Sequence, residues 1–204
     1  MREYLAACGI SDVDAYLNPD NIEYQSPDMY KNMDVAVNLF NHAKGSVGIV
    51  IDSDLDGACS AAIAYMLCIE NGLEDIHIYS HVGKEHGLSD LASQIAMDKL
   101  DLLIVPDAGS NDIYQCEELM CMGINIIILD HHIIEKSNRY ATVVNPYRAD
   151  NAPNINTDIS GTGVVEKFAC ALGSNQSFKD LVAVSLISDI CSLRSPENRK
   201  YVYD

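Results

Sequence analysis

The sequence predicts an α/β fold in which a mostly parallel five-stranded sheet carries helices on both faces. Two observations predict it. Short apolar runs rich in Val, Ile and Leu recur along the chain, separated by segments whose apolar residues have helical spacing. Acidic residues or histidines directly follow several of these runs, and at the carboxyl ends of parallel strands such residues meet at one edge of the sheet.

The first predicted elements lie between residues 33 and 79. A helix over 33–44 has apolar residues on one side, and the continuous apolar run over 47–51 is typical of a buried strand. A helix over 58–71 is rich in Ala, Ile, Leu and Met and ends at Asn71-Gly72, a common helix stop. Residues 76–79 form the second predicted strand.

The alternation continues to the end of the chain. We expect helices over 88–99, 111–122, 163–172 and 178–193, and strands over 102–105, 124–129 and 141–144. Apart from the helix over 33–44, the first part of the chain has prolines and acidic residues with little periodic pattern. We therefore expect residues 1–45 to be an extension of helix and loop, packed on a main domain of residues 46–204.

Composition narrows the class of protein. The chain has 204 residues and a net charge of −17, which argues against tight, non-specific binding of nucleic acid by the whole surface. Its seven cysteines are odd in number and form no Cys-x-x-Cys pair, so we expect neither disulfides nor a cysteine zinc site. With no apolar stretch of membrane-spanning length and an acidic, short N-terminus, we expect a cytoplasmic protein.

The most informative motif is Asp130-His131-His132, which follows the apolar run over 124–129. A carboxylate and two imidazoles at the carboxyl end of a buried strand lie where open α/β sheets bind ligands. Adjacent histidines are not needed there for packing. Together they can bind a divalent metal and contact the group that the metal activates.

A second motif, Asp52-Ser53-Asp54-Leu55-Asp56-Gly57, follows the first predicted strand. In an extended segment, carboxylates at alternate positions point the same way and repel one another unless cations lie between them. An acidic turn with a helix cap explains the same residues. A calcium-binding EF-hand loop is disfavoured by the apolar helix that follows and by the lack of a later Glu ligand.

Two further carboxylates complete the candidate site. Asp107 is the first charged side chain after the third strand, and Asp189 lies among apolar residues of the last predicted helix. A buried carboxylate is costly unless it is paired or bound to a metal, although Asp189 could also lie on a polar seam with neighbouring serines. Carboxylate oxygens with few imidazoles suit Mn²⁺ or Mg²⁺ better than a thiolate-seeking metal.

Signals for substrate contacts are weaker. His81 and His86 lie in a polar loop after the second strand, and Ser160-Gly161 opens a helix whose backbone amides could hold a phosphate. A solvent loop and an ordinary helix cap explain these residues equally well. The basic candidates for stabilising a phosphate are Lys84, Arg194 and Arg199.

Taken in order, the motifs resemble those of the DHH phosphoesterase superfamily, and most closely the N-terminal catalytic domain of RecJ-type single-strand exonucleases. The resemblance spans residues 47–199 and rests on IVIDSDLDGACS (49–60), IVPDAGS (104–110), IILDHH (127–132), Val144-Asn145-Pro146, SGTGVVEKF (160–168) and DLVAVSLISDICSLRSPENR (180–199). It implies that residues 46–204 form a Rossmann-like DHH catalytic domain.

The resemblance also implies an activity and assigns roles. The family hydrolyses phosphodiester bonds with Mn²⁺-activated water, through two divalent ions that are preferably Mn²⁺ and alternatively Mg²⁺. The positions that match its metal ligands are Asp54, Asp56, Asp107, His131 and Asp189, with Asp52 on the first acid of the RecJ-like motif. His132 matches the histidine that faces the substrate phosphate, and Asp130 is expected to orient the imidazoles.

Two departures from the family pattern stand out. Many members have a histidine where this chain has Val50, and RecJ-like relatives continue into a DHH-associated second domain that we expect to be absent here. We therefore expect either a catalytic fragment or a protein whose partner clamps the substrate, and in both cases the ligand is single-stranded nucleic acid or an oligonucleotide. The alternatives are a phosphoesterase for small substrates (cyclic dinucleotide, very short oligonucleotide or pyrophosphate) and a non-catalytic DHH scaffold in a replication or repair assembly.

Overall fold

A computed structural model describes residues 1–10, 12–83 and 85–204 and confirms the predicted fold class. Five parallel strands form one sheet in the order β2-β1-β3-β4-β5. Their bounds are Val47–Ile51 (β1), Ile76–Ser80 (β2), Leu102–Pro106 (β3), Asn125–Leu129 (β4) and Thr142–Val144 (β5). All five strands were predicted, with ends that differ by one residue at most.

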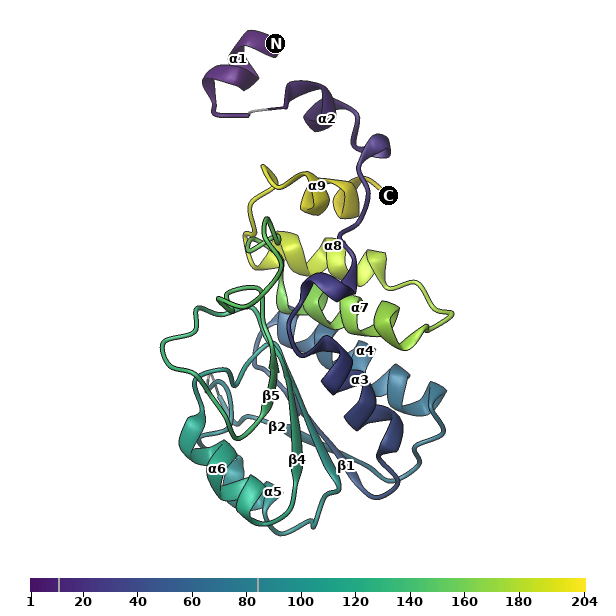
Figure 1. The fold of residues 1–204 in the computed structure, drawn as a ribbon, viewed down its shortest axis with the longest axis vertical. Helices are drawn as coiled ribbons and strands as arrows, with labels where there is room; N and C mark the ends of the chain where they lie inside the picture. Colours follow the sequence, from purple (N-terminus) through teal and green to yellow (C-terminus); the bar gives the residue numbers. More distant parts are fainter. Residues whose placement is uncertain (11, 84) are drawn as a thin grey trace.

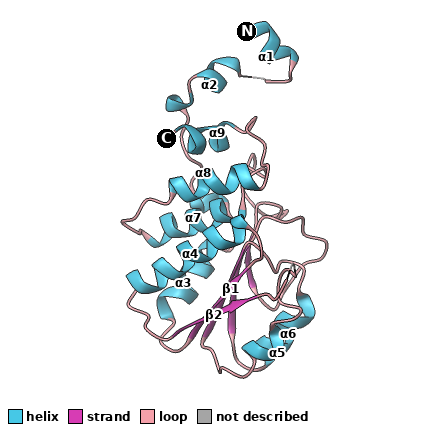
Figure 2. Ribbon diagram, turned by 180° about the vertical axis from the view of Figure 1, so that it is seen from behind, coloured by secondary structure: helices cyan, strands magenta, loops and turns pink. Residues whose placement is uncertain are grey.

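Helices cover both faces of the sheet, as Figures 1 and 2 show. On one face lie α3 (Met33–His42), α4 (Leu55–Glu70) and α7 (Gly161–Leu172), and on the other lie α5 (Ala92–Ile95) and α6 (Ile113–Cys121). Beyond α7 follow α8 (Lys179–Ser188) and α9 (Pro196–Tyr203). None of the helices in the described part of the chain has the length and apolar character needed to cross a bilayer.

Alternate residues of each strand serve two separate hydrophobic cores. Ile49, Ile104 and Ile127 face the core under α3, α4 and α7. Val50 and Leu103 face the core under α5 and α6. Burial on both sides explains why these strands are uninterrupted apolar runs, and it fixes their register against slippage.

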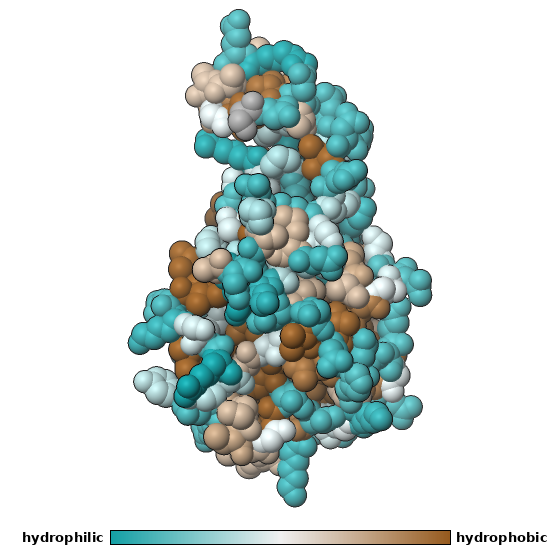
Figure 3. Space-filling model, viewed as in Figure 1, coloured by the Kyte–Doolittle hydropathy of each residue, from teal (hydrophilic) through white to brown (hydrophobic). Residues whose placement is uncertain are grey.

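The N-terminal segment projects beyond the body of the molecule (Figure 1). It contains α1 (Arg2–Ala7) and α2 (Val13–Leu17), which have no buried residues, and the 3₁₀ turn Pro19–Asn21. The next 3₁₀ turn, Pro27–Met29, packs against α7 and belongs to the body. Figure 3 shows the narrow N-terminal part above a broader body on which teal polar residues and brown apolar residues alternate. Helix α3 belongs to the body, because Phe40 packs edge-on against Phe168 with ring centroids 5.5 Å apart.

Two helix predictions differ most from the structure. The predicted helix over 88–99 forms only as α5, because Leu88 to Leu91 make turns, although their apolar residues are buried as the pattern indicated. The predicted helix over 178–193 ends at Ser188 as α8, since Ile190 adopts a left-handed backbone with φ of 55°. A new helix, α9, then begins at Pro196, and the sequence analysis missed it.

A buried ionic network joins α7 to α9. Lys167 Nζ lies 2.6 Å from Glu197 Oε1 and donates to the Tyr201 hydroxyl at 2.9 Å. Tyr201 in turn donates to Glu166 Oε2 at 2.6 Å. All four side chains are buried, so each charge depends on its partners for the solvation that water would otherwise supply.

We expect Lys167→Met to destabilise the fold by about 3–5 kcal/mol, because it leaves the Glu197 carboxylate buried without its cation. Urea unfolding followed by circular dichroism measures the change. Lys179→Met is the matched control, since the exposed pair that Lys179 makes with Asp204 should contribute less than about 1 kcal/mol. Equal effects of the two substitutions would contradict a structural role for the buried network.

Candidate active site and metal centre

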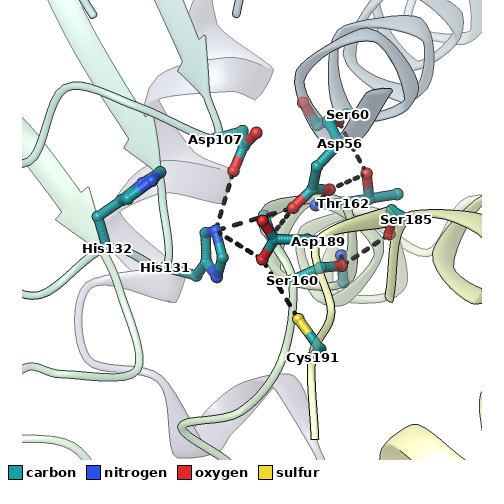
Figure 4. A network of polar contacts seen from close by, with 12 residues as sticks. Asp56, Ser60, Asp107, His131, His132, Ser160, Thr162, Ser185, Asp189 and Cys191 are labelled. Carbon is teal, nitrogen blue, oxygen red and sulfur yellow. Dashed lines mark hydrogen bonds and ion pairs between the residues drawn. The ribbon is translucent and has the colours of Figure 1, made fainter. Parts of the chain in front are cut away.

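Strand register brings three of the predicted carboxylates to one level at the carboxyl edge of the sheet. Ile49 of β1 pairs with Ile104 of β3, which pairs with Ile127 of β4. Three positions further along each chain segment, directly after the strand ends, lie Asp52, Asp107 and Asp130. The side chains in Figure 4 come from this edge and from the segments that pack over it.

The first acidic motif does not stay extended as predicted. Asp54 is the N-cap of α4 and accepts a hydrogen bond from Gly57 N at 2.9 Å, so the helix begins at Leu55, three residues earlier than expected. Asp56 therefore lies in the first helical turn, where the positive end of the helix dipole stabilises its carboxylate. Asp52 and Asp54 remain together beside Asp107, with ligand atoms within 4.8 Å of one another.

Asp56 binds the N-terminus of a second helix, α7. Its two carboxylate oxygens accept Gly161 N and Thr162 N, each at 2.8 Å, and Thr162 Oγ1 donates to Oδ1 at 2.5 Å. Gly161 is required at this position, because a Cβ atom there would collide with the Asp107 carboxylate. The contact brings α7 directly against the acidic edge of the sheet.

This contact also locates the residues expected to hold a phosphate. The amide of Gly161 is occupied by Asp56, and Ser160 is fully buried with its hydroxyl bonded to Gly163 N and to the Ser185 hydroxyl. The pattern that suggested a phosphate cradle is therefore explained by a carboxylate of the same chain. Ser160 and Gly161 as phosphate ligands remain a sequence prediction.

Asp107 is the least satisfied carboxylate of the described site. Its backbone has a φ of 62° and its side chain is 2% exposed. Among the described residues, nothing hydrogen-bonds to its Oδ1, which lies 3.2 Å from His131 Nε2. Burial, and then the negative charges of Asp56 and Asp130, raise the pKa of Asp107 well above its ordinary value. A cation bound to this carboxylate would offset the free-energy cost of burying its negative charge.

His131 directs one ring nitrogen into the acidic cluster. Its Nδ1 lies 2.9 Å from the carbonyl oxygen of Ile159, so Nδ1 carries the proton and donates. The Nε2 lone pair then faces Asp107 at 3.2 Å, Asp189 at 3.7 Å and Asp56 at 3.8 Å. Figure 4 shows this imidazole pointing to all three carboxylates, which is the orientation of a metal ligand fixed by a backbone acceptor.

Asp130 holds the backbone of both histidines and the imidazole of His132, whereas the imidazole of His131 is held by Ile159. Oδ1 of Asp130 accepts the amides of His131 and His132 and lies 2.8 Å from His132 Nδ1, while Oδ2 accepts Ser110 N. Burial by itself raises the pKa of Asp130, but these hydrogen bonds bring it below its ordinary value. The same hydrogen bond to Asp130 raises the pKa of His132, whose ring is more than half exposed.

Asp189 reaches the site from the C-cap of α8 and not from within a helix. The Cys191 thiol donates to Asp189 Oδ2 at 3.4 Å and lies close enough to join His131 and Asp189 in a group of possible ligands. Burial, and then the Asp189 charge, raise the pKa of Cys191. This cysteine was not predicted from the sequence, because only the turn after α8 brings it back to the site.

The loop after β2 contributes His86, whose Nδ1 lies 2.7 Å from Asp52 Oδ2. The sequence predicted that His86 lies in a polar loop at this edge, but it did not distinguish a substrate contact from exposure to solvent. The side chain of His81 is buried, and its Nδ1 lies 2.8 Å from Asp90 Oδ1. Lys84, a predicted substrate ligand, lies outside the described residues. Arg199 is also a predicted substrate ligand. It donates a hydrogen bond to the carbonyl of Tyr16 in the N-terminal segment, and its guanidinium covers the Tyr16 ring.

The donor set fits divalent cations. Within the described residues, groups of three possible ligands are Asp52–Asp54–Asp107, Asp107–His131–His132 and His131–Asp189–Cys191. Asp107 belongs to two of them, and its unpartnered buried oxygen is the observation that a cation would explain. Carboxylate oxygens with imidazole nitrogens favour Mg²⁺ or Mn²⁺ over thiolate-seeking ions.

Comparison with known proteins identifies the family. The N-terminal domain of the DHH family matches residues 46–189. The chain belongs to the DHH family. It is 31% identical over 207 residues to a Bacillus subtilis protein provisionally named SPbeta prophage-derived single-strand DNA-specific exonuclease YorK, covering 95% of this chain and 34% of that protein. It is 26% identical over 202 residues to the single-stranded-DNA-specific exonuclease RecJ of Haemophilus influenzae, covering 87% and 34%.

Solved structures agree with the fold. Exonuclease RecJ bound to manganese superposes with a TM-score of 0.74 at 24% identity, covering 85% of this chain and 46% of that one. RecJ of Thermus thermophilus in complex with Mn²⁺ gives 0.72 at 23%, covering 93% and 30%. The predicted resemblance is thus confirmed. The DHH-family chain described here spans about a third of the length of its curated exonuclease relatives.

We expect Asp107→Asn to weaken Mn²⁺ binding by at least about 100-fold, because even the loss of a supporting group commonly costs roughly 10–100-fold in metal affinity. Asparagine tolerates the left-handed backbone of position 107, so the fold should persist. Isothermal titration calorimetry measures the affinity, and circular dichroism checks the fold. Asp90→Asn, outside the carboxylate cluster, is the control. Mn²⁺ binding as tight as in the unaltered chain would rule out this assignment.

Metal binding should also appear in thermal stability. At a free Mn²⁺ concentration 100 times the dissociation constant, one bound ion stabilises the folded chain by about 2.7 kcal/mol. The midpoint of thermal unfolding should therefore rise with Mn²⁺ and fall again when EDTA is added. The Asp107→Asn variant should show neither change, and a rise of the same size in that variant would place the ion elsewhere.

Proposed function

We propose that this chain is a divalent-metal-dependent phosphodiesterase that hydrolyses single-stranded DNA or short oligonucleotides. The observation that carries the proposal is the buried, unpartnered Oδ1 of Asp107 facing His131 Nε2 at 3.2 Å. Support comes from the DHH family match and from relatives named as single-strand DNA exonucleases. The proposed metal ligands are Asp52, Asp54, Asp56, Asp107, His131 and Asp189.

When bound, a pair of divalent cations, preferably Mn²⁺, supplies Lewis-acid polarisation of a phosphoryl group and lowers the pKa of water toward about 7. The chain's own residues set the geometry of this chemistry. Asp107, placed between the first acidic motif and His131, would be the shared ligand. The hydrogen bond from His131 Nδ1 to Ile159 holds the other ring nitrogen in position, so binding requires little reorganisation.

His132 is proposed to contact the substrate phosphate. Asp130 holds Nδ1 of this ring, and this hydrogen bond raises the pKa of the imidazole. Its ring lies beside that of His131, with centroids 4.7 Å apart, and is exposed to solvent. A cationic donor at this place stabilises negative charge that develops on phosphoryl oxygens.

The acidic surface bears on the size of the substrate. A net charge of −17 repels a long polyanion, whereas a short strand needs only local cations and bound metal ions. This charge favours, as a second candidate, hydrolysis of very short oligonucleotides or cyclic dinucleotides by the same residues. Strand length is therefore the variable that separates the two functions.

The test is Mn²⁺-dependent degradation of end-labelled single-stranded DNA of graded length, followed by gel electrophoresis. We expect stepwise loss of nucleotides that EDTA abolishes. Asp107→Asn should remove the activity, and His132→Ala should lower kcat by about 100–1,000-fold, the usual cost of losing a group that stabilises developing charge. Asp90→Asn should behave as the unaltered chain.

Three results would change the proposal. Cleavage confined to strands of a few nucleotides or to cyclic dinucleotides would select the second candidate. Tight Mn²⁺ uptake without turnover of any phosphodiester would contradict a catalytic role and favour a scaffold. Equal activity of Asp107→Asn and the unaltered chain would show that hydrolysis comes from other residues or from a contaminant.

A further inference from the structure

A second hollow opens next to the candidate active site, between the loop that follows β4 and the loop that follows β5. Its volume is about 490 Å³, within the range of roughly 300–1,000 Å³ that is usual for small-molecule sites. The active-site hollow, of about 400 Å³, contains His131, His132 and Asp189. Tyr147 lines both hollows, so they are neighbours that share one aromatic wall.

Tyr147 is held in fixed relation to the active-site histidines by one buried side chain. Asn145, which is fully buried, donates from Nδ2 to the carbonyl oxygen of His132 at 2.9 Å and accepts Tyr147 N through Oδ1 at 2.8 Å. Asn151 donates to the carbonyls of Asn145 and Pro146, which fixes the loop further. Tyr147 is nevertheless 42% exposed. Its backbone is held in place, and its aromatic ring has room for a ligand.

The lining of the second hollow suits a nucleobase attached to a phosphate chain. Ile134 and Val143 supply apolar wall, and the charged part of the lining is mixed, with Lys136 and Arg148 beside Glu135 and Asp150. Asp150 holds Arg148 by two hydrogen bonds, at 3.0 and 2.9 Å, which orients the guanidinium. Aromatic stacking with flanking cations is the usual chemistry by which proteins bind single-stranded nucleic acid without reading its sequence.

We propose that Tyr147 and this hollow form a subsite for the nucleobase of a nucleotide next to the scissile phosphate. The proposal rests on the proposed phosphodiesterase function and adds to it the place where the strand is gripped. A strand whose phosphate lies at His131 and His132 passes Tyr147 on leaving the active-site hollow, and its base stacks there. Binding energy then comes from the base and not only from the phosphate.

Steady-state kinetics with two matched strands tests the subsite. One strand is a short thymidine oligonucleotide, and the other has the same length and phosphates but abasic sugars. We expect Tyr147→Ala to lower kcat/KM on the thymidine strand by about 5- to 150-fold, mainly through KM, as expected for the loss of one base–aromatic stack. The same variant should leave the abasic strand unaffected.

Two control variants distinguish stacking from a structural effect. Tyr147→Phe keeps the aromatic face and should retain kcat/KM within about twofold of the unaltered chain. Tyr114→Ala removes an exposed tyrosine on α6, outside both hollows, and should change neither strand. Equal kcat/KM of Tyr147→Ala and the unaltered chain on the thymidine strand would overturn the subsite while leaving the phosphodiesterase intact.

A binding measurement decides the subsite independently of turnover. The chain has no tryptophan, so Tyr147→Trp places a single indole fluorophore at the proposed subsite. We expect its emission to be quenched by thymidine monophosphate at fixed Mn²⁺ concentration, and not by deoxyribose 5-phosphate or inorganic phosphate. Tyr114→Trp is the matched control and should respond to none of them.

The two proposals fail in different ways. If the unaltered chain cleaves neither strand, the phosphodiesterase proposal is wrong, and the fluorescence titration alone judges the subsite. If the nucleotide does not quench Tyr147→Trp, or quenches Tyr114→Trp equally, the subsite is wrong whatever the chain cleaves.

Discussion

The contact between Asp56 and the N-terminus of α7 is the interaction on which the rest of the site depends. The carboxylate of one helix N-terminus accepts two amides and a hydroxyl from another, so two positive helix ends share one negative charge. This contact fixes α7 against α4 across the acidic edge. Ile159 lies two residues before α7, and its carbonyl oxygen accepts a hydrogen bond from His131 Nδ1. This bond directs the other ring nitrogen of His131 to Asp107.

The edge of the sheet accumulates negative charge that the fold alone does not neutralise. Asp52, Asp107 and Asp130 stand at one register level, and only Asp130 has hydrogen bonds to both oxygens within the described chain. The opposite pKa shifts of Asp107 and Asp130 follow from this difference in partners. Of these two buried carboxylates, Asp130 is hydrogen-bonded at both oxygens, and Asp107 has an oxygen without a hydrogen-bond partner among the described residues.

The sequence predicted which polar residues follow the strands at the acidic edge better than it predicted the helices around them. Residues that follow a buried parallel strand are placed by the sheet itself, which is why Asp52, Asp107, Asp130 and His131 could be assigned to one edge. The extent of α5 and the existence of α9 depended instead on turns and on Pro196, where local backbone conformation overrides apolar spacing. Cys191 and Tyr147 were missed as neighbours of the site because loops that fold back have no periodic signal.

The sequence by itself determined the fold class, the order of the strands in the chain and the identity of the acidic and histidine motifs, because strand burial and side-chain chemistry are local properties. The tertiary structure decided which partner each group has. In the folded chain the Gly161 amide donates to Asp56, and Arg199 donates to the Tyr16 carbonyl. Asn145 is hydrogen-bonded to both His132 and Tyr147. These contacts join residues far apart in the chain, and their distances depend on how helices and loops pack over the sheet.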